Sequence, residues 1–86
     1  MDEAEMQRTA RQIDAAVHKL VRAGNDDTAI FMAMAKHMPA FKRLMDAAGP
    51  GEMDQLASRL PGFHRYAKIL EGIATGISSG AITVPR

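Results

Sequence analysis

Cysteine and tryptophan are absent from this 86-residue sequence, and its aromatic residues are one Tyr and three Phe. Without cysteine the chain has no disulfide bond, no thiolate metal site and no cysteine nucleophile. An excess of one charge is also missing, since 11 Lys and Arg against 10 Asp and Glu give a formal net charge of +1. Net charge therefore implies no polyanionic partner. With only three histidines, we expect no enzyme and neither a metal nor a cofactor site.

Long hydrophobic runs are missing as well. The longest, Ala29–Ala35, is far shorter than the roughly 20 residues of a membrane-spanning helix. The segment Met1–Glu5 is acidic, whereas a secretory signal peptide begins basic and then becomes apolar. We therefore expect a cytoplasmic protein. A hydrophobic fraction of 47% in 86 residues predicts a single globular domain over residues 1–80, followed by a tail, 81–86.

The clearest periodicity lies in the first 23 residues. Apolar side chains recur there at intervals of four and three residues, at Met6, Ala10, Ile13, Val17 and Leu20. This spacing predicts an amphipathic helix. Gly24 follows, at a place where a left-handed C-terminal cap is favoured.

The opposite side of this first helix is basic. Five side chains fall within an arc of roughly 100°, and they are Arg8, Arg11, His18, Lys19 and Arg22. An arc of this kind is typical of a surface that binds phosphates or acids. It is equally typical of the solvated outer face that every amphipathic helix has. The sequence leaves both interpretations open.

Glycine and proline divide the rest of the chain into further helices. The breaks are Gly49–Gly51 and Pro61–Gly62, and Pro39 suits the first turn of a helix. We expect a buried helix that ends or kinks at Met38, because the residue before a proline disfavours helical geometry. After Gly80 the tail is expected to be extended. The predicted helices after the first are Ala29–Met38, Pro39–Ala48, Glu52–Leu60 and Phe63–Ile77, which makes the fold class all-α: a compact bundle of four to five short helices joined by Gly/Pro turns.

Methionine is concentrated near His37, a combination that soft metals favour. Met32 and Met34 are two positions apart, however, and such residues point to different sides of a helix. We therefore expect Met32, Met34 and Met38 to fill the core or to line a groove for a partner, rather than to bind a metal.

The most unusual segment is the uncharged run that begins at Gly72. Glycines four residues apart, such as Gly72 and Gly76, allow another backbone to approach closely, although a fraying helix end would also explain them. We expect close packing, and we expect a small non-enzymatic protein–protein interaction module, such as an accessory subunit, docking domain, regulator or inhibitor, that forms a homodimer or binds another protein. The predicted partner contacts are Ile69, Gly72, Ile73, Gly76 and Ile77, with Phe31, Met34 and Met38 added if the second helix is not wholly interior.

An alternative function is a small DNA-binding regulator. Leu56–Leu60, a short turn and then Ile69–Gly72 resemble the repressor-type helix-turn-helix over about 17 residues, within residues 52–72. The sequence departs from that family at Pro61–Gly62, where one glycine or small polar residue usually stands. The resemblance implies nucleic-acid contacts from Arg59, His64, Arg65 and Lys68.

Overall fold

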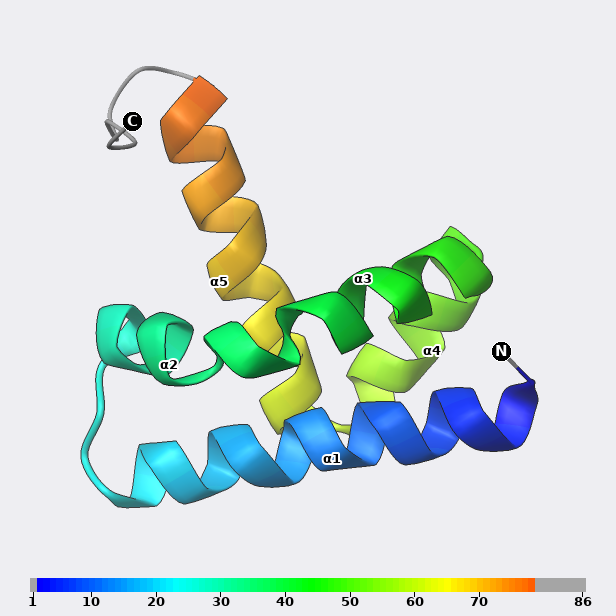
Figure 1. Ribbon diagram of the computed structural model, residues 1–86, viewed down its shortest axis with the longest axis horizontal. Coiled ribbons are helices and arrows are strands. Elements are labelled where there is room, and N and C mark those ends of the chain that lie inside the picture. The colour runs from blue at the N-terminus through cyan, green and yellow to red at the C-terminus, as the bar shows by residue number, and fades with distance from the viewer. Residues whose placement is uncertain (1, 79–86) are drawn as a thin grey trace.

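The regular structure of residues 2–78, which the computed structural model describes, is entirely helical (Figure 1). The prediction of an all-α bundle is therefore confirmed. The predicted extended tail, 81–86, lies outside the described residues. The elements in chain order are α1 (Glu3–Arg22), α2 (Asp27–Ala33), the 3-10 turn η1 (Ala35–His37), α3 (Met38–Ala47), α4 (Pro50–Arg59) and α5 (Pro61–Ser78).

Helix α1 begins and ends as its sequence predicts. The carboxylate of Asp2 caps its first turn. At the other end Gly24 adopts a φ of 87°, which residues other than glycine rarely adopt. Its backbone N–H donates to the carbonyl of Val21, and that of Asn25 to the carbonyl of Leu20. This is the Schellman pattern, which satisfies carbonyls that the helix end would leave without partners.

The apolar segment after α1 differs from the prediction of one buried helix. The α-helix ends at Ala33, and Met34 forms a turn before η1. Met34 is 1% exposed, but Met32 is 70% exposed. The reason is that consecutive apolar residues on a helix point in all directions, while the bundle covers α2 on one side only. Met38 has helical backbone angles and begins α3, so the predicted end or kink lies not at Met38 but at Met34, where α2 ends.

Prolines stand in the first turn of three helices. Pro39 occupies this place in α3, as predicted, and Pro50 begins α4 two residues before the expected start at Glu52. Proline lacks a backbone N–H, and the first turn of a helix has no internal partner for that group. The glycine–proline break therefore begins a helix as well as ending one.

The core lies where all five α-helices meet. The stripe of α1 is confirmed, because its central residues are buried and its end residues are partly buried. Phe41 packs against Phe63 and Tyr66, with ring centroids 5.5 and 5.2 Å apart. The buried cluster consists of Ala10, Ile13, Val17, Ile30, Met34, Phe41, Leu44, Leu56, Phe63, Tyr66 and Ile69.

Two helices define the shape of the molecule (Figure 1). Helix α1 runs along one edge, with all the other helices on the same side of it, and α5 rises from its middle. The C-terminal turns of α5 project beyond α2 and α3. Among the described residues, no helix has the length and apolarity needed to cross a membrane.

Candidate interaction surface

The distal segment of α5, residues 70–78, is the part of the described chain that stands farthest from the bundle (Figure 1). The apolar stripe of α5 is buried at Phe63, Tyr66 and Ile69. It continues onto this segment through Leu70 and Ile73, which are only partly buried. The bundle therefore covers the stripe at the base of the helix and leaves it half covered at Leu70 and Ile73.

The base of α5 is held by a carboxylate from α1. Asp14 Oδ1 accepts hydrogen bonds from the backbone N–H groups of Gly62, at 2.6 Å, and Phe63, at 3.2 Å. A helix N-terminus has N–H groups without internal partners, and its dipole favours a negative charge there. Leu60 precedes α5 and has no side chain that could cap it. Asp14 therefore supplies the cap from 48 residues earlier in the chain.

Glycine is required at position 62 by this contact. A Cβ atom built on Gly62 would lie 2.6 Å from the backbone oxygen of Asp14 and 2.8 Å from its carboxylate. From the sequence, Pro61–Gly62 was predicted only as a break between helices, and this contact was not predicted. The available signal was Leu60, an apolar residue at a position where a capping side chain is usual.

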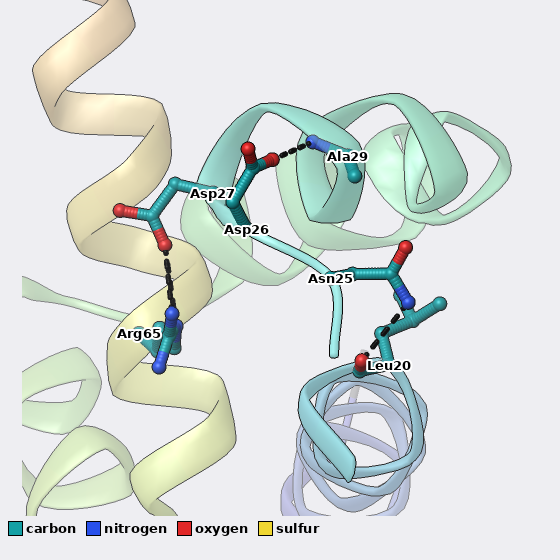
Figure 2. Close-up of polar contacts among 6 residues, drawn as sticks. All are labelled: Leu20, Asn25, Asp26, Asp27, Ala29 and Arg65. Carbon is teal, nitrogen blue, oxygen red and sulfur yellow. Dashed lines mark hydrogen bonds and ion pairs between the residues drawn. The ribbon is translucent and has the colours of Figure 1, made fainter. Parts of the chain in front are cut away.

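Two further contacts join α5 to the α2 region. Arg65 donates from Nη2 and Nε to Asp27 Oδ1, at 3.0 and 3.3 Å, as Figure 2 shows. The hydroxyl of Tyr66 donates to the carbonyl of Met34 at 3.4 Å. Burial raises the pKa of the Tyr66 phenol above 10.0, because desolvation disfavours the phenolate. Tyr66 is therefore a neutral hydrogen-bond donor at physiological pH.

The predicted partner contacts fall into two groups. Met34 and Ile69 are 1% and 8% exposed and belong to the core, so they have little surface left for a partner. Gly72 is exposed, whereas Ile73, Gly76 and Phe31 are partly covered and Met38 is 39% exposed. Ile77 lies in α5, but its side chain is outside the described part of the chain.

Gly72, unlike Gly62, shows no close packing within the described chain. A Cβ atom built on Gly72 would meet nothing within 4 Å. No segment of residues 2–78 therefore approaches the helix at Gly72. The close packing expected at Gly72 is therefore not made by residues 2–78, and packing against a partner there stays a prediction.

The predicted helix-turn-helix residues do not form the expected arrangement. A single residue, Leu60, separates α4 from α5, whereas the motif has a turn of three or four residues. Arg65 pairs with Asp27, and Lys68 Nζ lies 3.5 Å from Glu71. Arg59 and His64 are exposed on different helices. Part of the positive charge on this surface is therefore neutralised within the chain.

Small-molecule and metal sites have little support among the described residues. No group of three or more His, Asp or Glu side chains there could hold a metal ion. A cleft of about 250 Å³ lies between the start of α1 and α4, with Glu3, Glu52 and Arg59 in its walls. All three of these side chains are exposed.

Comparison with protein-family models, with curated proteins and with solved structures finds no match to this chain.

Proposed function

We propose that the protein is a small non-enzymatic helical module that binds another protein chain through the distal segment of α5, as an accessory subunit, docking domain, regulator or inhibitor. The observation that carries this proposal is the apolar stripe of α5. The bundle covers it at Tyr66 and Ile69, yet it continues to Ile73 on turns that project from the molecule. A partner helix would complete its burial.

The neighbouring glycine supports this use of the segment. Gly72 is exposed, and the space beside it is empty within residues 2–78. Glycine inside a helix lowers its stability by roughly 0.5–1 kcal/mol relative to alanine. A partner backbone that packs against Gly72 would offset this loss.

A second copy of the chain is the simplest partner in this proposal. The near-neutral net charge opposes self-association only weakly. The nine residues of the distal segment span only about 13 Å, which is short for an interface of roughly 800 Å² per partner. The proposed interface therefore includes Phe31 on α2, one of the helices that contact α5. A cytoplasmic location is part of the proposal and is consistent with the lack of cysteine.

The substitution Gly72→Leu separates binding from folding. The added side chain enters open space in the single chain, so the helix should fold at least as well as before. In a complex the same side chain would push the partner away. Gly51→Leu is the matched control, since Gly51 lies in α4 and also has open space around it.

Two measurements test the proposal. Light scattering over a concentration series should show a dimer for the wild type and for Gly51→Leu, and a monomer for Gly72→Leu. A photo-crosslinker placed at exposed Thr75 in the native cell should capture a protein, and Gly72→Leu should abolish the product. A crosslinker at exposed Lys42 on α3 is the control. A monomeric wild type together with no Gly72-dependent crosslink would reject the proposal.

A further inference from the structure

The basic face of α1 (Arg8, Arg11, His18, Lys19 and Arg22) lies opposite the buried apolar stripe of the same helix. Helix α1 itself forms one edge of the molecule (Figure 1). All five side chains are exposed. The face extends about 21 Å along the helix at 1.5 Å per residue. Between its members stands only the small residue Ala15, and the arc contains no acidic residue.

These charges are not neutralised by the rest of the described chain. Within residues 2–78, none of the four Arg and Lys side chains of the face pairs with a carboxylate. Asp14 lies beside the face, but its carboxylate caps α5 and approaches only His18, at 3.4 Å. Four permanent cations exceed the formal charge of the whole chain, +1, so the remaining residues carry a net negative charge.

A solvated outer face does not require this arrangement. Exposed helix faces gain stability from opposite charges three or four positions apart, whereas like charges at these spacings destabilise the helix. Here Arg8 precedes Arg11 by three positions, and Lys19 precedes Arg22 by three. Glu5 and Asp14 stand three positions from Arg8 and Arg11, but neither carboxylate forms an ion pair with these arginines in the described chain. The helix dipole favours the basic residues in the last turn, but it gives no reason for Arg8 and Arg11 in the first half.

We propose that the basic face of α1 binds the phosphate backbone of double-stranded DNA, independently of the distal segment of α5. Over 21 Å a duplex presents on the order of ten phosphates. The B-form major groove, about 12 Å wide, admits an α-helix. Arg8 and Lys19 lie on one flank of the face and Arg11 and His18 on the other, toward opposite walls of such a groove.

Other anionic partners fit this face less well. Double-stranded RNA has a narrow, deep major groove that a helix does not enter. Single strands are held by aromatic stacking, and the face contains no aromatic residue. Protein interfaces have an apolar, aromatic core, but the largest apolar residue on this arc is alanine. A face with several separated cations and no large apolar residue therefore fits double-stranded DNA better than these other partners.

The test is fluorescence anisotropy of a labelled 20-base-pair DNA duplex of random sequence at several salt concentrations. The wild type should bind, with a slope of log K against log salt of roughly −3 to −4 for four phosphate contacts. The double variant Arg8→Gln/Arg11→Gln should lose at least about tenfold in affinity and flatten the slope by about 2. Glutamine preserves helix propensity, and circular dichroism checks the fold.

Two control variants and two competitors decide the interpretation. Lys36→Gln/Lys42→Gln removes the same charge from exposed positions outside α1 and should leave binding unchanged. The second control is Arg65→Gln/Lys68→Gln. If either control loses DNA binding while the Arg8→Gln/Arg11→Gln variant still binds DNA, the proposal is overturned. The same holds if the wild type does not bind at about 50 mM salt. Equal or stronger binding to duplex RNA or to a polyglutamate chain would also overturn it.

Discussion

Removal of the Asp14 carboxylate should weaken the docking of α5 on α1 more than loss of an ordinary helix cap. Its Oδ1 accepts from two N–H groups that belong to buried residues, Gly62 and Phe63. In Asp14→Ala these donors lose a charged partner where water has poor access. A hydrogen bond to a charged group contributes about 1.5–3 kcal/mol, and measured cap deletions cost about 0.5–2 kcal/mol.

From these values we expect Asp14→Ala to lower the free energy of unfolding by about 2–4 kcal/mol. The total free energy of unfolding of a domain of this size is roughly 4–13 kcal/mol. The midpoint of thermal unfolding should fall by roughly 10–20 °C. Asp14→Asn keeps an oxygen acceptor but not the charge, so it should lose about 1–2 kcal/mol.

Urea unfolding followed by circular dichroism at 222 nm measures these differences. The control is Asp26→Ala, which removes an exposed cap whose Oδ1 accepts from Ala29 N–H at 2.9 Å (Figure 2). Water can replace that bond, so the loss should be only about 0.5–1 kcal/mol. If Asp14→Ala costs no more than Asp26→Ala, the carboxylate does not hold α5 and the reasoning is refuted.

Two further predictions concern α5. Gly62→Ala places a Cβ atom 2.6 Å from a backbone oxygen of α1 and should destabilise the fold by about 2–3 kcal/mol, whereas Gly72→Ala meets open space and should stabilise it by about 0.5–1 kcal/mol. Urea midpoints that move in the same direction for both variants would contradict this. The raised pKa of Tyr66 means that the folded state disfavours the phenolate, so the contribution of Tyr66 to stability should be fully present below the pKa of tyrosine in the unfolded chain and be lost as the pH rises through the folded pKa. Tyr66→Phe should abolish that fall and cost about 0.5–1.5 kcal/mol at pH 7. Because Tyr66 is the single tyrosine, absorbance at 295 nm follows its titration, and an unchanged alkaline profile in Tyr66→Phe would count against the assignment.

Most of the fold prediction depended on patterns among residues that are close together in the sequence. The four- and three-residue spacing from Met6 to Leu20 located α1, and Gly24 located its end, because both effects act within a few residues of the chain. The expectation of a buried helix over Ala29–Met38 failed for the opposite reason. Hydrophobicity indicates that a segment is helical, but not how many sides of it the other helices cover, and Met32 remained exposed.

The two candidate surfaces were also predicted only in part from the sequence. The sequence showed that Gly72 and Ile73 lie on one uncharged segment of a helix and that the basic residues of α1 share an arc, since sequence order and helical geometry alone fix these relations. It did not show that Met34 and Ile69 belong to the core, nor that Lys68 faces Glu71.

The helical character of the chain, both ends of α1 and the side of α1 on which its basic residues lie were thus fixed locally, because these features depend on hydrogen bonds and spacings within one or two turns. Tertiary structure alone decided that Asp14 caps a helix 48 residues away and that Gly62 must have no side chain. It also decided that the C-terminal turns of α5 extend beyond α2 and α3 (Figure 1). These features depend on distances between segments that are remote in the chain, and only the packed arrangement of the whole bundle sets such distances.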